Sequence, residues 1–384
     1  MMIGGPRLRL ARQARGFSQQ QLASMAGVSR QAVSAVESGL SDPSLRVALA
    51  LAQALGMTVD ELFGGESAVP AVPARLVGGP GLAGARVTLA PIGDSLVALP
   101  LTAAAASRAG FLPAGGLLAD SNPEPVAQPD AGSAALIRPV WPPRPTLVVA
   151  GCDPALPLLE EPLSRLDPPI AFSWWPCTSQ EALRLAADGL VHAAGAHLRD
   201  HRGGYNTGSA ADLLAGGGEV IGFSAWREGL VLTQAAADGI AGFGDVASRG
   251  LRLVNREPGA EARRVLDREL ASAGIDGQQV PGYRTAAAGH LQVADIIAAG
   301  LADAGVACEP AALAYGLAFI PLAVERFDLV IPAAHADSRE VQALVKVLGS
   351  RWLLDQLASL PGYDPSSCGQ YIATLSPGAG EQSG

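Results

Sequence analysis

The chain has 384 residues, of which 49% are apolar, and a formal net charge of −9. This length exceeds one ordinary domain and predicts two or three. The acidic balance excludes a protein that binds nucleic acid over its whole surface. The charge is uneven, however: residues 1–65 carry six arginines and four acids, a net charge of +2, and the remainder carries −11. Any contact with nucleic acid is therefore expected at the N-terminus.

Several kinds of chemistry lack the residues they need. Lys346 is the single lysine and sits in the apolar run VQALVKVL, so no P-loop lysine is present. The four cysteines are far apart without a CxxC pair, so neither a zinc knuckle nor a redox pair can be read. We expect no metal site and no cofactor. The absence of an apolar leader or membrane-length segment predicts a cytoplasmic protein.

The first 63 residues carry the signals of five consecutive helices. Ser18 and Gln21 form a capping box that opens the second helix, with Leu22 and Met25 expected to face inward. The turn Ala26-Gly27-Val28 follows, and Ser29 caps a third helix over residues 30–37. A fourth helix is predicted to begin at Asp42 and Pro43 and to stop at Gly56. Its expected apolar stripe consists of Leu45, Leu49, Ala52 and Leu55.

This block, residues 1–66, resembles the DNA-binding domain of the Cro/phage-repressor (XRE) family. The matching elements are the Ser-Gln opening of the second helix, the Ala-Gly-Val-Ser turn and the Arg-Gln start of the third. The resemblance implies that the third helix lies in the major groove of an operator. It also implies base readers at Arg30, Gln31 and Ser34, since Gln suits adenine and Arg suits guanine, and phosphate contacts at Gln19 and Ser29. The alternative is a generic helical bundle with a solvated polar face.

Residues 67–145 are predicted to form a linker that contains short β-strands. The segment up to Gly84 is rich in Pro, Gly and Ala, and strand-like runs follow near residues 86–90, 95–99 and 135–138. From residue 146 onward, apolar strands alternate with helices, which predicts an α/β fold with a mostly parallel sheet. The strands are expected at 146–150, 170–173, 190–194 and 251–255, and the helices at 156–166, 179–187 and 291–299. This part, residues 146–384, is long enough for two lobes.

The stretch from about residue 149 to 371 resembles the substrate-binding fold of type II periplasmic binding proteins, in its molybdate-binding-like version. The resemblance is carried by GCDPAL (151–156), residues 177–200, GGYN (203–206), WREGL (226–230), and residues 253–263, 289–305 and 316–332. It implies a first lobe from residues 146–228 and 319–384 and a second lobe from residues 229–318. A ligand would lie between the lobes, which close about two crossing segments.

The candidate ligand contacts follow strand ends, where helix N-termini offer free N–H groups. Together with two arginines, Arg227 and Arg263, they predict an anionic ligand. The alternative is that the arginines form interdomain ion pairs with residues such as Glu228 or Glu261. His192 is expected to be a core residue. The predicted ligand-binding residues are Thr178, Ser179, His197, Tyr205, Asn206, Arg227, Gly259, Arg263, His290 and Asp303.

One departure from the family pattern bears on the ligand. Relatives usually read Gly-Ser-Gly-Thr-Arg where this chain has Gly-Ala-Glu-Ala-Arg at residues 259–263. Two hydroxyl donors are replaced and a carboxylate is added, which disfavours molybdate or tungstate. A zwitterionic organic ligand, whose amine meets Glu261 or Asp303, is the hypothesis that fits this change.

The sequence thus predicts a one-component transcription regulator that is not an enzyme. It would bind an inverted-repeat operator as a homodimer and respond to a small molecule or an oxyanion. The alternative functions are an enzyme that acts on a small organic acid in the cleft, and a binding protein of the transport type.

Overall fold

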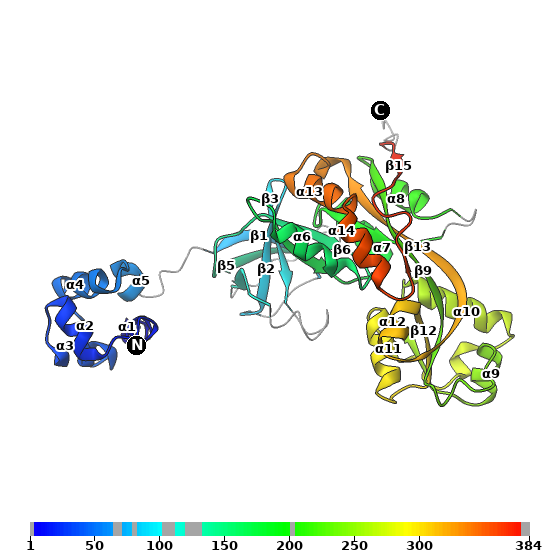
Figure 1. Ribbon diagram of the computed structural model, residues 1–384, viewed down its shortest axis with the longest axis horizontal. Helices are drawn as coiled ribbons and strands as arrows, with labels where there is room; N and C mark the ends of the chain where they lie inside the picture. The colour runs from blue at the N-terminus through cyan, green and yellow to red at the C-terminus, as the bar shows by residue number, and fades with distance from the viewer. Residues whose placement is uncertain are drawn as a thin grey trace. The chain divides into compact units, whose positions relative to one another are not determined.

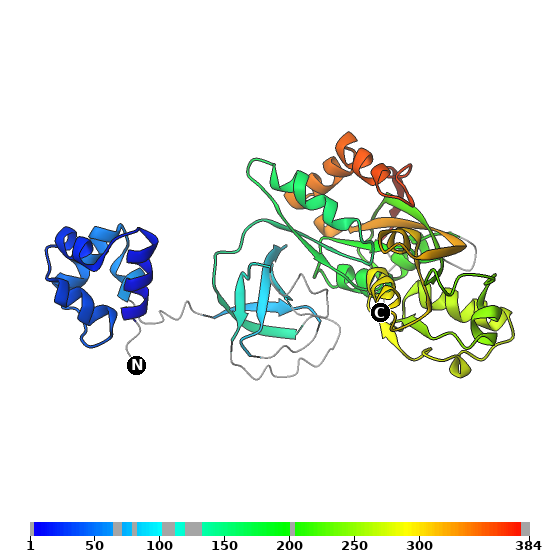
Figure 2. The same ribbon diagram turned by 60° about the horizontal axis from the view of Figure 1, so that its bottom comes forward.

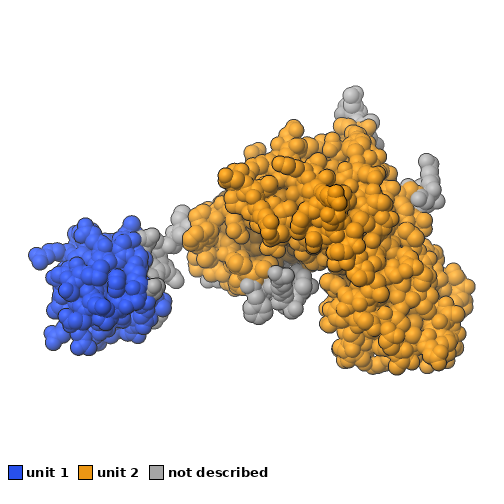
Figure 3. All heavy atoms as spheres, viewed as in Figure 1, with its two compact units in different colours: residues 1–71 blue, residues 72–384 orange. Residues whose placement is uncertain are grey.

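The computed structural model describes residues 4–63, 71–78, 83–101, 112–119, 133–199 and 204–377. Two compact units are present, residues 1–71 and residues 72–384, coloured blue and orange in Figure 3. Each unit is described by itself. Among the described helices, none combines the length and the apolar character that crossing a membrane requires.

Unit one is a bundle of the five predicted helices. These are α1 (Gly4–Ala14), α2 (Gln19–Ala26), α3 (Arg30–Glu37), α4 (Leu45–Leu55) and α5 (Val59–Phe63). Its core is built from fully buried leucines and valine: Leu8, Leu22, Val33, Leu51 and Leu62.

The helix signals of unit one act largely as the sequence suggests. The capping box at the start of α2 is present, with both the Ser18 and the Gln21 side chains bonded to backbone. Gly27 ends α2 at φ +64°, a left-handed conformation that glycine adopts without strain. The Ser29 hydroxyl accepts the N–H of Ala32 over 3.1 Å and so opens α3.

Three predictions for unit one are wrong. Ser44, rather than Asp42 and Pro43, caps the fourth helix, because its hydroxyl accepts the N–H of Val47 and α4 begins only at Leu45. Leu45 is 73% exposed and Leu49 is 50% exposed. Met25 is also exposed. The buried face of α4 consists instead of Ala48, Leu51, Ala52 and Leu55, whose spacing is that of one helix face.

The N-terminal part of unit two is a closed five-stranded barrel where the sequence suggested a linker (Figure 2). The strands pair in the order β1-β3-β2-β4-β5. Their bounds are β1 Val72–Leu76, β2 Arg86–Ile92, β3 Ser95–Pro100, β4 Gly116–Leu118 and β5 Ser133–Pro139. Three of these strands match the strand-like runs in the sequence.

The barrel packs on the rest of unit two rather than merely connecting it. Val77, Ala90 and Ile92 share one apolar core with Val148 and Leu183. Arg75 in addition donates a hydrogen bond to the carbonyl of Asp188 over 2.6 Å. The barrel strands carry apolar residues on both faces. One face forms the core of the barrel, and the other packs against the α/β domain. A linker would not be expected to bury apolar residues in this way.

The remainder of unit two is a two-lobed α/β domain, as predicted. The prediction of a mostly parallel sheet is wrong, because four described strand pairs are parallel and five are antiparallel. The sheet runs in the order β11-β10-β12-β9-β13-β8-β6-β7, and β14 and β15 also pair with β9. Two long antiparallel strands, β9 (Gly218–Leu232) and β13 (Ala318–Pro332), pass from one lobe to the other (Figure 1).

Each lobe places its own helices around its part of the sheet. Lobe one contains β6 (Thr146–Ala150), β7 (Ala171–Trp175), β8 (Ala193–Ala196), β14 (Tyr363–Asp364), β15 (Tyr371–Leu375), the 3-10 helix η3 (Leu156–Leu159), and helices α6 (Glu160–Ser164), α7 (Ser179–Ala187), α8 (Thr207–Leu213), α13 (Arg339–Leu348) and α14 (Arg351–Ser359). Lobe two contains β10 (Leu253–Arg256), β11 (Ala286–Ala287), β12 (Ala304–Cys308), and helices α9 (Phe243–Ser248), α10 (Glu261–Ser272), α11 (His290–Ala298) and α12 (Glu309–Ala314). Strand β6 and helix α7 occur at their predicted bounds, whereas the strand predicted from residue 190 begins only at Ala193.

Candidate functional site

The first two turns of α3 present polar side chains to solvent. Arg30, Gln31 and Ser34 are exposed, while Val33 and Val36 on the other side of the helix are buried in the core. This division follows from the helical period and leaves the predicted base readers on one accessible surface. Their contact with DNA remains a prediction.

The two residues predicted to contact phosphate, Ser29 and Gln19, make different hydrogen bonds within the domain. Ser29 is exposed, and its hydroxyl caps α3. The side-chain amide of Gln19 donates to Glu37 Oε2 over 2.8 Å, so this nitrogen is directed into the domain and not toward a phosphate.

A buried ion pair fixes α3 to α1. Arg12 Nε lies 2.6 Å from Glu37 Oε1, and Arg12 Nη2 lies 3.0 Å from Oε2. Burial raises the pKa of Glu37, but the hydrogen bonds from Arg12 and Gln19 outweigh it and leave this pKa below its ordinary value. Arg12 also donates to the carbonyl of Phe17. Every charged group of this network therefore has a partner, and the network links α1, α2 and α3.

A second group of buried polar side chains lies where the two lobes meet. We call it the interlobe cluster, and its residues come from both lobes and from both crossing strands. Its members are Cys152, Asp153, His197, Trp226, Glu228, His290 and Glu325, each at most 5% exposed.

Strand periodicity explains how the crossing strands contribute to the cluster. Side chains of a strand alternate between its faces, so Ser224, Trp226 and Glu228 lie on one face of β9. The register of β9 with β13 places Glu325 opposite Trp226 and Phe327 opposite Ser224. One face of the two-stranded bridge therefore carries two carboxylates and an indole.

The other members, and Cys308 beside them, follow the ends of strands or begin a helix. Cys152 and Asp153 come shortly after β6, and His197 comes directly after β8. His290 is the first residue of α11, and Cys308 is the last residue of β12. The carboxyl ends of parallel strands meet at one edge of a sheet, which is where ligands of open α/β folds bind.

Asp153 is well satisfied by its surroundings. It accepts hydrogen bonds from the Ala155 N–H over 2.8 Å, from the Ser224 hydroxyl over 2.8 Å and from the Tyr363 hydroxyl over 2.7 Å. Burial nevertheless leaves its pKa raised, since these bonds only partly offset the loss of water. Asp153 holds β6, β9 and β14 together and has a structural role.

The two histidines of the cluster are in different electrostatic environments. His197 Nε2 lies 3.1 Å from Cys152 Sγ. Burial lowers the pKa of His197, but the neighbouring sulfur and carboxylates raise it well above the ordinary value. His290 accepts the N–H of Cys308 at Nδ1 over 3.2 Å. Burial, with Arg256 and His197 nearby, holds the pKa of His290 well below the ordinary value, so this ring is neutral.

Several polar atoms of the cluster have no hydrogen-bond partner among the described residues. His197 Nδ1 lies 3.9 Å from Glu325 Oε2, and His290 Nδ1 lies 3.8 Å from Glu228 Oε1. Burial raises the pKa of Glu228 to about 7. The atoms without a partner include His197 Nδ1, Trp226 Nε1, both oxygens of Glu228, His290 Nε2 and Glu325 Oε2. Buried polar groups normally have partners, so this concentration makes the junction the candidate binding site of the described residues.

The structure brings His197 and His290 together but directs the predicted arginines elsewhere. Arg227 lies on the face of β9 opposite Trp226 and Glu228, is exposed, and pairs with Glu309, with 2.8 Å between Nε and Oε2. Successive side chains of a strand point to opposite faces, so Arg227 points away from the face that carries Trp226 and Glu228. Arg263 donates to the carbonyl of Arg256 and lies over the ring of Tyr283 within lobe two.

Asp303 was predicted to contact the ligand, but it lies away from the interlobe cluster. It precedes β12, whose opposite end, Cys308, is the one that reaches the interlobe cluster. Its carboxylate instead pairs with Arg252 over 2.8 Å. Glu261, the other group suggested to meet an amine, is buried at the start of α10 and pairs with Arg264.

The remaining predicted residues lie around the cluster in supporting positions. Ser179 accepts the N–H of His197 at its hydroxyl, and Thr178 caps α7 close to Gly259 of the opposite lobe. The Tyr205 hydroxyl donates to the carbonyl of Val324 over 2.6 Å. Asn206 donates to Asp328 and accepts from the N–H of Leu198, which makes it a structural residue. His192 is buried beside β6, as expected of a core residue.

Sequence reasoning missed several members of the cluster. Cys152 and Asp153 follow the apolar strand TLVVA, a position from which contacts to a ligand could have been expected. Glu228 and Glu325 lie within otherwise apolar strands, and a carboxylate in such a run is itself a signal of function. Trp226 gave no such signal.

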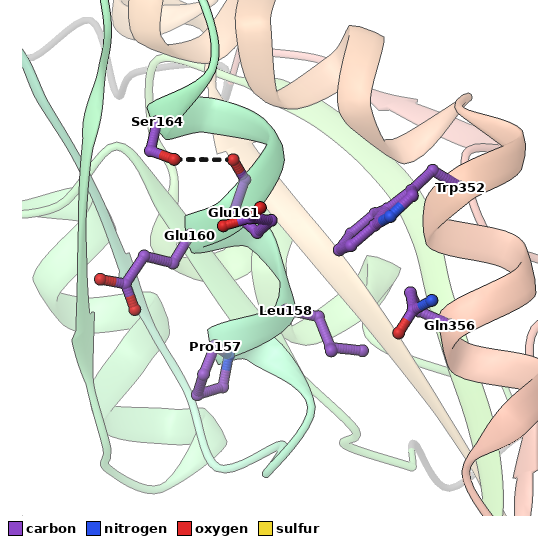
Figure 4. A pocket seen from close by; sticks show the side chains of 7 residues that line it. All are labelled: Pro157, Leu158, Glu160, Glu161, Ser164, Trp352 and Gln356. Atoms are coloured by element: carbon purple, nitrogen blue, oxygen red, sulfur yellow. Dashed lines mark hydrogen bonds between the residues drawn. The ribbon is translucent and has the colours of Figure 1, made fainter.

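A separate hollow of about 330 Å³ lies on lobe one, away from these residues (Figure 4). Trp352 and Gln356 of α14 face the segment of η3 and α6 across it. Its described lining includes Glu160 and Glu161 and no basic side chain, so it does not fit the predicted anion.

Comparison with known proteins matches two separate parts of the chain to known families. The helix-turn-helix family profile matches residues 8–62, and the PBP superfamily domain profile matches residues 160–349. An uncharacterised HTH-type transcriptional regulator of Methanocaldococcus jannaschii is 37% identical over 57 residues, which is 15% of this chain and 86% of the relative.

Two further relatives are similar to parts of the chain. The uncharacterised protein YvgK of Bacillus subtilis is 30% identical over 146 residues, 38% of this chain, and the match spans 47% of YvgK, about half its length. The restriction-modification controller protein C.AhdI of Aeromonas hydrophila is 46% identical, with 15% of this chain and 89% of that chain covered and a TM-score of 0.15. The chain belongs to the XRE-type helix-turn-helix family, and its helix-turn-helix domain is joined to a domain of the PBP superfamily.

Proposed function

We propose that this chain is a cytoplasmic, ligand-responsive transcription regulator. One observation carries the proposal. A helix-turn-helix domain with an exposed, polar third helix is joined to a two-lobed domain, and polar atoms buried at the junction of the lobes have no partner among the described residues. The first feature suits operator binding, and the second suits a small ligand enclosed between the lobes.

The DNA contact rests on the first two turns of α3. Arg30, Gln31 and Ser34 are exposed there, on a helix held by the buried Arg12–Glu37 pair. One such domain offers few base contacts, so we propose a homodimer on an inverted repeat. Its half-sites would lie about one helical turn, roughly 34 Å, apart or a multiple of that distance.

The ligand contact rests on the interlobe cluster. A buried polar atom without a partner costs about 1–3 kcal/mol, which a ligand that pairs with it can recover. Because the cluster draws residues from both lobes, an occupant stabilises their closed arrangement. Closure would then alter operator affinity by a factor set by the ligand's preference for one arrangement, about 5–150-fold in typical allosteric proteins.

The full chain can be tested without knowing either ligand or operator beforehand. Operators are selected from random duplex DNA, and the dissociation constant is measured by fluorescence anisotropy. In parallel, transition-metal ions, oxyanions, amino acids and organic acids are screened for those that raise the melting temperature. We expect at least one compound that stabilises the chain to change operator affinity several-fold without being consumed.

Two results would contradict the proposed function. The first is that the chain selects no preferred DNA sequence. The second is that every stabilising compound leaves operator affinity unchanged. Turnover of a stabilising compound would favour the enzyme alternative instead.

A further inference from the structure

We propose that the interlobe cluster binds a thiophilic divalent transition-metal cation of the Zn²⁺ class, held by Cys152, His197 and His290. This assignment rests on the proposed function, because it names the ligand class of the same junction. The three donors come from distant parts of the chain, so they form no sequence motif typical of a metal site.

The donor geometry is close to that of a metal centre. One side-chain donor atom from each of Cys152, His197 and His290 lies within 4.8 Å of the other two, and all three residues are buried. The Cys152 Sγ to His197 Nε2 distance is 3.1 Å. Donors of a tetrahedral Zn²⁺ site lie roughly 3.3–3.6 Å apart, given its usual bond lengths. A small adjustment of the rings brings the three donors to that spacing.

Each histidine also has its Nδ1 near a buried carboxylate. His197 Nδ1 lies 3.9 Å from Glu325 Oε2, and His290 Nδ1 lies 3.8 Å from Glu228 Oε1. Metal-binding histidines usually donate their second N–H to a carboxylate, which orients the ring and increases its basicity. The pairing of two histidines with two carboxylates repeats that arrangement and gives the buried glutamates a role.

The proton on His290 must move when a cation binds. Cys308 N–H donates to His290 Nδ1 over 3.2 Å, which places the imidazole proton on Nε2. A cation at Nε2 takes the position of that proton, and the proton transfers to Nδ1. The ring then turns from the Cys308 amide toward Glu228. The Cys152 thiol and the imidazolium of His197, at Nε2, each release a proton to solvent when the cation binds.

The charges of the site favour a cation over an oxyanion. Glu228 and Glu325 lie beside the donors, and the nearby Arg256 is already paired with Glu257, with 2.7 Å between Nε and Oε2. An anion would be buried next to two carboxylates, whereas a divalent cation is stabilised by them. A thiolate and two imidazoles also suit Zn²⁺ and similar ions better than Mg²⁺ or Ca²⁺, which prefer oxygen donors.

The origin of the donors explains how a cation would act on the domain. Cys152 and His197 belong to lobe one and His290 begins α11 of lobe two, so a bound ion links the lobes directly. The rings of Trp226 and Phe327 pack against His197 at centroid distances of 5.6 and 6.2 Å and help to exclude water. Three protein donors leave one tetrahedral position for water or a small metabolite.

Cobalt is a suitable probe because its spectrum reports a sulfur ligand. The full-length chain is stripped with a chelator and titrated with Co²⁺. We expect one equivalent to bind, with a thiolate-to-cobalt charge-transfer band and the visible bands of tetrahedral cobalt. Cys152→Ser should remove the charge-transfer band, whereas Cys368→Ser, a buried cysteine outside the cluster, should keep it.

Glu228→Gln tests the carboxylate behind His290. It should weaken Co²⁺ binding by about 10–100-fold while the charge-transfer band remains at saturation. If Cys152→Ser fails to fold, the wild-type chain still gives a test: Co²⁺ should protect Cys152, but not Cys368, from alkylation by iodoacetamide in mass spectrometry. Both samples contain the same low concentration of denaturant, so that buried thiols become exposed often enough to react with iodoacetamide.

The assignment is overturned if Co²⁺ does not bind, if binding is unchanged in Cys152→Ser, or if Cys152 is alkylated equally with and without the ion. Failure of the metal site and failure of the regulator remain distinguishable. Operator affinity that responds to another compound while Co²⁺ does not bind removes only the metal assignment. Co²⁺ binding at Cys152 without any effect on operator affinity upholds the site and contradicts the proposed regulation.

Discussion

The two units of this chain bury charged groups in opposite ways. In the helix-turn-helix domain, Glu37 is buried against Arg12 and Gln19, and both of its carboxylate oxygens are bonded. In the interlobe cluster, both oxygens of Glu228 are buried without a hydrogen-bond partner among the described residues. A network in which every buried charge is hydrogen-bonded holds its helices in one arrangement. A network with unbonded buried oxygens can be completed by a bound ligand. The comparison separates a structural charge from a binding charge within a single molecule.

The largest expected effect breaks the satisfied network. Glu37→Ala leaves Arg12 buried without its partner, which should cost about 3–5 kcal/mol of stability. Hydrogen exchange of the α1–α3 amides measures this loss in the full chain. The five tryptophans all lie in unit two, so their fluorescence unfolding transition serves as an internal control. An unchanged exchange rate in α1–α3 would show that the ion pair does not hold the helices.

The same pair gives unit one an acid sensitivity. The pKa of Glu37 in the folded chain lies below its ordinary value of 4.5. Its contribution to stability is therefore complete above that ordinary value and is lost as the pH falls through the lower, folded pKa. We expect exchange in α1–α3 to accelerate on acidification over that range. Glu37→Gln should flatten this dependence, and an equally steep profile in that variant would assign the sensitivity to other groups.

Removing a carboxylate from the interlobe cluster should increase stability, in contrast to the loss expected at Glu37. Glu228→Met removes a buried carboxylate that has no partner and should stabilise the chelator-treated chain by about 1–3 kcal/mol. Tryptophan fluorescence during denaturation follows unit two directly. The same variant should lose ligand-dependent stabilisation. Destabilisation comparable to that of Glu37→Ala would mean that Glu228 has a structural partner after all.

A smaller effect is expected at the surface of α3. Gln31→Ala should cost roughly 1–3 kcal/mol of operator binding and relax sequence preference at one base position. Operator selection and anisotropy measure both. The folding of unit one should be unaffected, because Gln31 is exposed. Unchanged affinity and selectivity would place the DNA contact on another face.

The sequence was sufficient for much of the fold because the signals were local. Ser18 with Gln21, Ser29 and Gly27 each act through bonds within one turn, and β6 and α7 lie at their predicted bounds. The start of α4 could not be settled in this way, since Ser44 and Asp42 are both good caps and only packing selects between them. The barrel was missed because its pairing is long-range.

The candidate site was harder to predict for the same reason. Cys152, His197 and His290 become neighbours only through the order of the strands and the register of β9 with β13. Arg227 was expected at the ligand, yet a shift of one residue along a strand reverses the face. Strand alternation instead favours Glu228, which lies on the other face of β9 and is a charged residue in an apolar run.

The central claim is that occupancy of the interlobe cluster changes operator binding. Its most direct test is the dissociation constant of the full chain for a selected operator, with and without Co²⁺, while absorption confirms that the ion is bound. We predict a change of at least about fivefold in the wild type and none in Cys152→Ser. Equal dissociation constants for the loaded and metal-free wild-type chain, with the charge-transfer band present, would contradict the account.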